Sequence, residues 1–350
     1  MVELRTSRWQ KPRQGATLLL FTGMKPEHAP MEEFLWSEQE EPHKSRRLAL
    51  LKEHPGVLKR FAKKNWTLGP TVVVANIIQF SLAYALRDSP WWALLIVAYT
   101  VGGTVNHAMT LAMHELAHNL ASKSLLVNRV VGMLSNLPLG IPSYATFKRY
   151  HLEHHKYQGE EGIDVDVPTA AEGVFFVTPL RKVLWCFMQP LFYSLRPIIV
   201  LPKALSTIEG INWLVQVVVD AAVVYYWGPR SLLYLIGGTL LGMGVHPMAG
   251  HFIAEHYTFE GEQETYSYYG PLNWFSYNVG YHNEHHDFPN VPGTDLPKVR
   301  QLSATDYDDL PIHSSWIKVI YRYITNPKIT PFSRVKRNTM GGGLSAEESM

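Results

Sequence analysis

The stretch WWALLIVAYTVGGTVNHAMTLAMHELAH, residues 91–118, joins an apolar run to a terminal pair of histidines four positions apart. Its first part, residues 91–113, is long enough to cross a bilayer as one helix, because about 20 apolar residues span the hydrocarbon core. A four-residue polar turn separates this run from another apolar run at residues 69–86. The two runs therefore predict a transmembrane hairpin whose returning end carries a histidine pair.

A second hairpin is predicted from the apolar runs at residues 211–227 and 231–249, because only three residues separate them. Two other apolar segments, 125–141 and 183–201, are interrupted by proline, glycine or charged residues. We expect these two segments to lie at the membrane surface or to be partly buried. The predicted fold is therefore an all-α integral membrane protein, with four spans in two hairpins under a helical cap that carries the histidines.

The region before the first apolar run is polar, with thirteen lysines and arginines against eight acidic residues in positions 1–64. Positive charge favours the cytosolic side of a membrane, so we expect this leader region to be cytosolic. Two hairpins with short far-side turns would return the histidines and both termini to the same side. The membrane domain is predicted to occupy residues 65–335, and residues 336–350, which contain three consecutive glycines, are predicted to be a flexible tail.

The composition excludes several classes of function. A net charge of +2 is too small to indicate a nucleic-acid partner. The single cysteine, Cys186, rules out a disulfide framework, a thiolate zinc finger and a CxxC redox pair. Histidine is the unusual residue, because the chain contains 16 of them and they are unevenly placed.

Three histidine clusters give the strongest chemical signal: HELAH at 114–118, HLEHH at 151–155 and HNEHH at 282–286. On a helix, residues three or four positions apart share one face, so each cluster directs its imidazoles to one point. One metal ion cannot use all eight, since zinc takes four ligands and mononuclear iron oxygenases commonly take two histidines and a carboxylate. Two metal ions are therefore predicted, with the ligands His114, His118, His151, His154, His155, His282, His285 and His286. Imidazole suits iron, zinc, copper and nickel, so the ligands alone do not choose the element.

Residues outside the clusters are candidates for further roles. His251 is the expected additional ligand, because it follows the fourth predicted span closely. Carboxylates beside the clusters would orient ligand rings through the second ring N–H, as is common in metal sites. The candidates for an extra ligand, or for a residue that contacts a ligand, are His246, His256, Glu153, Glu284 and Asp287.

The remaining histidines and acidic residues are assigned structural or surface roles. His107 lies within a predicted span and is expected to be a buried hydrogen-bonding residue. Asp164 and Asp166 are expected to be structural, with a contact to metal or substrate as the alternative. Four isolated histidines are predicted to be ordinary surface residues: His28, His43, His54 and His313.

HELAH also matches the HExxH pattern, in which two histidines bind zinc and the glutamate, here Glu115, is the general base of a metalloprotease. A membrane zinc metalloprotease is therefore the alternative from another reaction class. It needs only one further ligand and leaves two complete HxxHH clusters without a role. Metal analysis distinguishes the protease hypothesis from the two-metal hypothesis, because a protease would hold one zinc ion per chain.

At these clusters the chain resembles the membrane fatty-acid desaturase and hydroxylase superfamily, whose pattern is HxxxH, HxxHH and HxxHH. The flanking segments are more specific, and over nearly the whole chain they resemble the sphingolipid (dihydroceramide) delta-4 desaturases. The segments that carry this resemblance are EPHKSRR (41–47), NH (106–107), LPLGIP (137–142), GHFIAEHY (250–257), YGPLNW (269–274) and DFPNVPG (287–293).

The resemblance implies two iron ions, bound by the eight cluster histidines and His251, with O2 as co-substrate. Electrons would come from NADH through cytochrome b5 reductase and a separate cytochrome b5. The implied substrate is dihydroceramide in the endoplasmic reticulum membrane, and the implied product has a trans double bond between C4 and C5 of the sphingoid base. Some relatives hydroxylate C4, so a C4-hydroxylase or a bifunctional enzyme is the alternative within the family.

Overall fold

The computed structural model describes residues 31–261 and 263–338, and helices predominate in these ranges. The α-helices are α2 (Pro42–Glu53), α3 (Val57–Phe61), α4 (Leu68–Ala85), α5 (Trp91–Val97), α6 (Gly103–Ala117), α7 (Leu125–Asn136), α8 (Tyr144–Lys156), α9 (Ala170–Phe175), α10 (Pro179–Val200), α11 (Thr207–Trp227), α12 (Pro229–Gly244), α13 (His251–Ala254), α14 (His282–Asp287), α15 (Leu296–Leu302), α16 (Ala304–Tyr307) and α17 (Trp316–Thr325). Tighter or wider helical turns are η2 (Ala98–Gly102), η3 (Leu137–Leu139), η4 (Pro247–Gly250) and η5 (Pro271–Phe275). The strands are β1 (Leu35–Ser37), β2 (Ser267–Tyr268), β3 (Ile312–His313) and β4 (Val335–Arg337).

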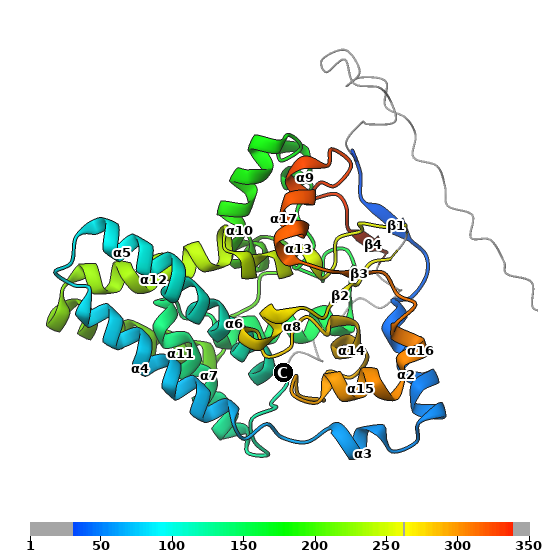
Figure 1. Cartoon of the computed structure of the whole chain (residues 1–350), viewed down its shortest axis with the longest axis horizontal. Coiled ribbons are helices and arrows are strands. Elements are labelled where there is room, and N and C mark those ends of the chain that lie inside the picture. The colour runs from blue at the N-terminus through cyan, green and yellow to red at the C-terminus, as the bar shows by residue number, and fades with distance from the viewer. Residues whose placement is uncertain (1–30, 262, 339–350) are drawn as a thin grey trace, which may run out of the picture.

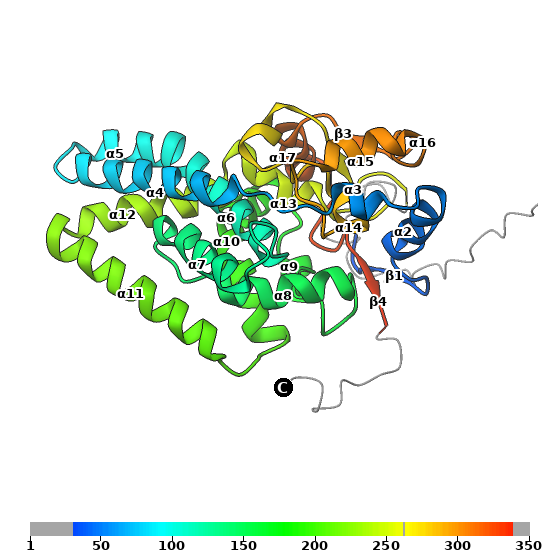
Figure 2. The same cartoon turned by 90° about the horizontal axis from the view of Figure 1, so that it is seen from below.

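The molecule has two parts that both views separate. In Figure 1 and Figure 2, α4, α5, α11 and α12 extend together to the left as a bundle. The shorter helices α2, α8, α14, α15 and α16 and all four strands lie on the right. α6 runs from the bundle into the right-hand part, so it joins the two.

Four continuous helical segments are long and apolar enough to cross a membrane: Leu68–Ala85, Trp91–Ala117, Pro179–Val200 and Thr207–Trp227. Three of these segments, namely α4, α5 continued through α6, and α11, coincide with predicted spans. The number of crossings rises to six if two bent helix pairs are each counted as one span. The prediction of a multi-span helical protein is confirmed at this level.

The fourth predicted span, 231–249, is divided between two elements. α12 ends at Gly244, and the chain bends by 42° before it continues through η4 and α13. Pro247 opens η4, and a proline within a helix removes a backbone hydrogen bond and clashes with the preceding turn. One apolar run in the sequence therefore covers a helix and a bend.

The segment 183–201, which we expected at the membrane surface, lies within the continuous helix α10. Its internal prolines, Pro190 and Pro197, do not break the helix. The charge of Arg196 is neutralised inside the protein, because the guanidinium donates to the Glu172 carboxylate over 2.7 and 2.9 Å. The charge that interrupts this run thus pairs with a carboxylate on α9. Figure 1 shows α10 steeply inclined to α4 and α12.

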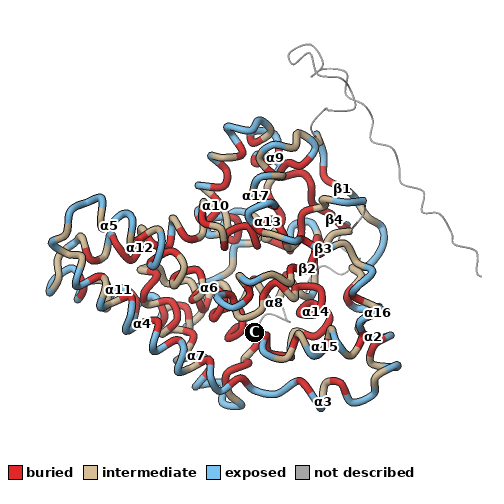
Figure 3. The backbone as a smooth tube through the Cα atoms, viewed as in Figure 1, coloured by how far each residue is buried: buried red, intermediate tan, exposed pale blue. Residues whose placement is uncertain are grey.

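The outward faces of the bundle are apolar. Ile77 and Ile78 on α4 and Leu214 and Val218 on α11 are all exposed. An apolar surface of this extent is unusual for a soluble monomer and is typical of a lipid-facing surface. Figure 3 shows exposed and buried residues alternating along these helices, whereas buried residues gather around α6, α13 and α14.

The inside of the bundle combines close helix packing with buried polar groups. α6 and α12 cross where Gly103 meets Gly242, and a Cβ on Gly242 would lie 2.5 Å from the Gly103 carbonyl oxygen. Small residues at such a crossing let two helices approach closely within a membrane. Nearby, Gln79 donates to Asn106 over 2.5 Å and accepts from Tyr234 over 2.7 Å, which ties α4, α6 and α12 together.

A sharp break positions the second histidine cluster. α7 and α8 meet at 112° across the segment that follows η3. Gly140 has a φ of +67°, a conformation that favours glycine, and Pro142 follows it. The break turns α8 so that its histidines face the end of α6.

Two short parallel strand pairs add to the predicted all-α fold: β1 with β4, and β2 with β3. Leu35 pairs with Val335 and Ser37 with Arg337, so the leader lies beside the last described residues. The predicted flexible tail therefore begins too early, because β4 extends to Arg337. Residues 339–350 of that tail and residues 1–30 of the leader lie outside the described residues.

Candidate metal centre

Five imidazoles from three helical segments form what we call the first imidazole group: His114, His118, His151, His155 and His285. One ring nitrogen of each lies within 4.8 Å of those of the others. The Nε2 atom of His151 is 2.9 Å from that of His118 and 3.1 Å from that of His155. His285 Nε2 lies 3.1 Å from His155 Nε2. The end of α6 thus meets two histidines of α8 and one histidine of α14 at one point.

A second imidazole group consists of His154, His256, His286 and His282. The first three form a cluster of possible ligand atoms. His256 Nε2 lies 3.0 Å from His154 Nε2 and 2.9 Å from His282 Nε2, which brings in the fourth ring. The two groups adjoin, because the rings of His155 and His286 stack with centroids 4.1 Å apart.

These contacts fit metal ligation better than hydrogen bonding. An imidazole nitrogen carries either one N–H or one in-plane lone pair. His151, His155 and His256 each place one Nε2 near two others, so hydrogen bonds cannot account for every contact. Nitrogens about 2.1 Å from a metal ion are separated by roughly 3 Å at right angles, which is the observed spacing.

The protonation states of the third cluster agree with a ligand role. Burial lowers the pKa of His285 and His286 well below the usual histidine value. Both rings are therefore neutral near pH 7, and neutral imidazole is the form that binds a metal ion. Burial also raises the pKa of the nearby Glu284 to about 7.

Two carboxylates contact ligand-type histidines, and neither was predicted to do so. Asp164 Oδ1 lies 3.0 Å from His154 Nδ1, the ring nitrogen that faces away from the second imidazole group. Glu255 Oε1 lies 2.8 Å from His251 Nδ1 and 3.6 Å from His282 Nδ1. A carboxylate on the second ring nitrogen fixes the tautomer and orientation of a ligating histidine. Glu255 lies four positions after His251, a spacing that could have indicated the pair.

The carboxylates that we expected in this role bind elsewhere within the described residues. Glu153 forms an ion pair with Lys203. Glu284 accepts hydrogen bonds from Ser267 and Tyr269 over 2.9 and 2.8 Å. Helix geometry explains this, because a residue between two cluster histidines points away from their shared face.

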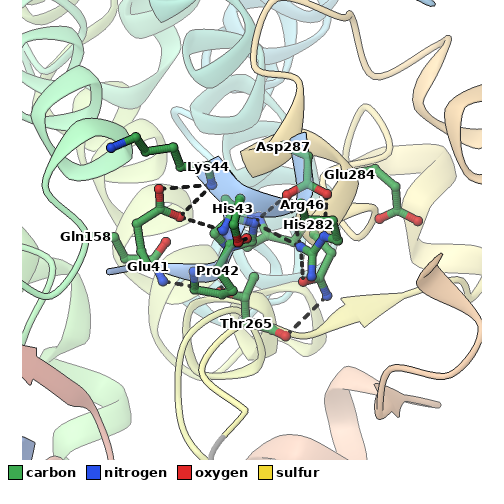
Figure 4. A network of polar contacts seen from close by, with 12 residues as sticks. Glu41, Pro42, His43, Lys44, Arg46, Gln158, Thr265, His282, Glu284 and Asp287 are labelled. Atoms are coloured by element: carbon green, nitrogen blue, oxygen red, sulfur yellow. Dashed lines mark hydrogen bonds and ion pairs between the residues drawn. The ribbon is translucent and has the colours of Figure 1, made fainter. Parts of the chain in front are cut away.

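Asp287 also makes its contacts away from the imidazole rings of the clusters. Its carboxylate binds His43, Arg46 and Tyr307, and Figure 4 shows the first two of these contacts. Burial alone would raise the pKa of Asp287, but hydrogen bonds from His43 and Arg46 and the charge of Arg46 outweigh it and lower the pKa. The surface prediction for His43 is wrong, because this ring is buried against the third cluster.

The predictions for the other isolated histidines are confirmed in one case and wrong in another. His107 is buried and its Nδ1 donates to the Gly242 carbonyl over 2.9 Å, which confirms the expected role. The surface prediction for His313 is wrong, since its ring is buried against Phe259 and Tyr266. His28 lies outside the described residues.

His251 and His246 lie apart from both imidazole groups. His251 is buried, but its ring packs against Phe252 and Trp316, and its Nδ1 faces Glu255. His246 lies near the bundle, with its Nε2 3.3 Å from the Thr104 hydroxyl. His256, which we had ranked behind His251, occupies the central position in the second group.

The contacts of Glu115 argue against the protease. Its carboxylate accepts from the Gly293 backbone N–H over 3.1 and 3.2 Å and is buried. A general base must instead face a metal-bound water. The two histidines of HELAH also belong to a group of five, more than the three protein ligands of a catalytic zinc site.

Comparisons with known proteins identify the family. A family model described as Fatty acid desaturase matches residues 89–316, and one described as Sphingolipid Delta4-desaturase matches residues 30–61. The chain is 47% identical to sphingolipid delta(4)-desaturase DES1 of Xenopus tropicalis over 315 residues, which cover 89% of this chain and 97% of that protein. This chain belongs to the sphingolipid delta(4)-desaturase family.

Relatives from distant animals agree with this assignment. DES1 of Homo sapiens is 47% identical over 312 residues, or 89% of this chain and 96% of that protein. DES1 of Drosophila melanogaster is 46% identical over 314 residues, or 88% of this chain and 97% of that protein. In this desaturase the match at residues 30–61 covers α2 and α3, so the leader is itself characteristic of the family.

Proposed function

We propose that this desaturase converts dihydroceramide to ceramide by introducing a trans double bond between C4 and C5 of the sphingoid base, using two iron ions and O2. The observation that carries the proposal is the pair of adjoining imidazole groups beside the end of α6. Similarity to DES1 proteins over nearly nine tenths of the chain supports the sphingolipid substrate.

The two imidazole groups would each hold one iron ion. The first ion would be bound by His114, His118, His151, His155 and His285, and the second by His154, His256, His282 and His286. Nine imidazoles take part, as the family resemblance suggested, but His256 takes the place that we expected for His251. Bound iron would supply the oxidising power to remove hydrogen from an unactivated carbon chain.

The chain's own residues would position these groups and keep water out. Asp164 holds the His154 ring by its Nδ1, and the backbone carbonyl of Glu264 lies 3.3 Å from His256 Nδ1. All four rings of the second group and three of the five in the first are buried, and His151 and His155 are half-buried, which limits the access of water to a reactive oxidant. The reaction balances when one O2 accepts two hydrogens from the substrate and two electrons with two protons from a donor, which yields two waters.

The location of the site suggests how the substrate reaches it. The first imidazole group begins where α6 ends, at the inner end of a candidate membrane span. A sphingoid base that enters from the bilayer would meet the site just beyond the membrane surface. We infer that this side is cytosolic, that the membrane is that of the endoplasmic reticulum, and that a separate cytochrome b5 delivers electrons from NADH and its reductase.

The test is expression in a cell that lacks its own desaturase, followed by mass spectrometry of the long-chain bases. The proposal predicts a new base with a C4–C5 double bond. A base with a C4 hydroxyl would indicate the hydroxylase alternative, and a mixture would indicate a bifunctional enzyme. An unchanged base profile from a membrane-inserted, iron-loaded protein would contradict the proposal.

A further inference from the structure

The leader helix α2 is packed against the third histidine cluster. Glu41 caps the helix, since its carboxylate accepts from the backbone N–H groups of His43 and Lys44 over 2.6 and 3.1 Å. His43 and Arg46 lie three positions apart, so they share one face of α2. That face meets α14, whereas Lys44 points outward and pairs with Glu40 at the surface (Figure 4).

Asp287, at the end of α14, receives most of the contacts from α2. Arg46 donates to both carboxylate oxygens, with Nε 2.6 Å from Oδ2 and Nη2 3.0 Å from Oδ1. His43 Nδ1 lies 2.8 Å from Oδ1, and the Tyr307 hydroxyl donates to Oδ2 over 2.9 Å. The carboxylate is fully buried, and four hydrogen bonds from three residues hold it. Asp287 directly follows His286, so this cage fixes the end of the helix that carries His286.

His43 also reaches the second imidazole group by two other routes. Its ring packs against the His286 ring, with centroids 4.8 Å apart. Its Nε2 lies 2.9 Å from the Thr265 hydroxyl, and that hydroxyl lies 3.4 Å from His256 Nδ1. Two members of the group, His286 and His256, are therefore supported through one leader residue.

Arg46 strengthens the same support. Its Nη2 donates to Asn283 Oδ1 over 3.0 Å, and the Asn283 amide donates to the Thr265 carbonyl over 3.2 Å. The segment that includes Thr265 is thus tied to α14 and to α2. In the described part of the chain, the side-chain hydrogen bonds that His43 and Arg46 make outside α2 all go to Thr265, Asn283 or Asp287.

The first imidazole group depends on the leader less directly, because only His285 among its five rings comes from α14, the helix that ends at Asp287. Its rings come from the end of α6, from α8 and from α14, and among the described residues no hydrogen bond joins them to α2. The two groups therefore differ in what holds them, although they adjoin.

We propose that the leader helix α2 is a clamp for the second iron, with His43 and Arg46 as positioning residues that act through Asp287 and Thr265 on His286 and His256. This inference rests on the proposed di-iron site. It also gives a role to the leader, the segment that matches the Sphingolipid Delta4-desaturase family model. Loss of the clamp weakens the retention of one iron and leaves the other in place.

The test measures iron in the purified, detergent-solubilised full chain during titration with a chelator. The variants are Arg46→Ala and His43→Ala, with Lys44→Ala as the matched control on the exposed face of the same helix. Removing a partner of a metal ligand typically weakens metal binding by about 10- to 100-fold. We expect one iron to be released at a correspondingly lower chelator concentration in both variants, while the control releases its iron as the wild type does.

Two conservative variants separate positioning from folding. Arg46→Lys keeps the charge but lacks the planar guanidinium fork that donates to both oxygens of one carboxylate. His43→Asn keeps a donor near the position of Nδ1 but loses the ring that packs on His286. Both are expected to fold and to show an intermediate shift in the release of the same iron. The thermal unfolding midpoint of each variant accompanies the iron measurement.

Release of both irons in parallel, or of neither, in the conservative variants would overturn the clamp. An intermediate shift confined to one iron supports it, even if an alanine variant does not fold. A wild-type chain without iron would contradict the proposed function itself. A wild-type chain with two irons whose release no variant changes would contradict only the clamp.

Discussion

The two imidazole groups adjoin, yet they are held in different ways. The first group takes four of its five rings from the end of α6 and from α8, and the Nδ1 atoms of His155 and His285 have no hydrogen-bond partner. The second group is held by polar contacts, with Asp164 on His154 and Thr265 near His256. The first group thus depends on helix packing and the second on a network of buried hydrogen bonds.

Because of this difference, a mutation can weaken the binding of one iron more than that of the other. A change in the bundle is expected to disturb the first group, and a change in the leader or in the loops is expected to disturb the second. Mutations graded by their distance from the rings can therefore separate the two groups.

Removal of a ring is the largest expected effect. His151→Ala or His285→Ala in the first group, and His154→Ala in the second, are expected to abolish desaturation, because both irons serve one reaction. Mass spectrometry of long-chain bases in cells that express each variant measures this. Substantial product from any of these variants, present at wild-type protein levels, would refute the ligand assignment.

The next effect separates His256 from His251. His256→Ala is expected to reduce activity as strongly as the loss of a cluster histidine, because its Nε2 lies at the centre of the second group. His251→Ala is expected to retain both irons, since its ring lies outside the groups and its Nδ1 faces Glu255. Iron content per chain decides between them, and loss of an iron only from the His251 variant would contradict this placement.

An intermediate effect is expected from Asp164→Asn. The amide can still accept a hydrogen bond from His154, but it lacks the negative charge that strengthens the ring as a ligand. Loss of such a partner typically reduces activity or metal affinity by about 10- to 100-fold. Asp308→Asn, at an exposed ion pair with Arg300, is the matched control. Equal activities of the two variants in a membrane assay would show that Asp164 does not support His154 as a ligand.

The smallest effect concerns the bundle that supports the first group. Gly242→Ala places a Cβ 2.5 Å from the Gly103 carbonyl oxygen, so α6 and α12 must separate. Overpacking of this kind costs about 1–3 kcal/mol. Gly237→Ala, on the same helix with open space around its Cβ, is the control and is expected to be neutral. Thermal unfolding in detergent compares them, and an equal midpoint for both would show that the crossing tolerates the change.

The sequence predicted much of the fold and most of the site because both signals are local. Apolar runs of bilayer length became α4, α5 with α6, and α11. The spacing of four residues correctly paired His114 with His118, His151 with His155 and His282 with His286. The prediction that each cluster directs all its rings to one point is wrong for the two HxxHH clusters, because His154 and His285 each lie in the other group. The bends at Gly140 and Pro247 and the continuity of α10 were harder to predict. A proline, a glycine or a charged residue does not by itself show whether a helix ends there or continues and packs against a neighbour.

The parts that could not be predicted depend on contacts between distant segments. His43 meets Asp287 across 244 positions, and nothing in the spacing of either residue indicates the other. His256 and His251 are separated by five residues, and only the fold of the loop after α13 decides which ring meets His154. Asp164 reaches His154 because the chain turns back after α8.

The most direct test of the two-group account is a high-resolution structure of the iron-loaded chain with anomalous scattering measured at the iron edge. Two iron peaks are expected. One would lie among His114, His118, His151, His155 and His285, and the other among His154, His256, His282 and His286. A single peak, or a second peak ligated by His251 in place of His256, would contradict it.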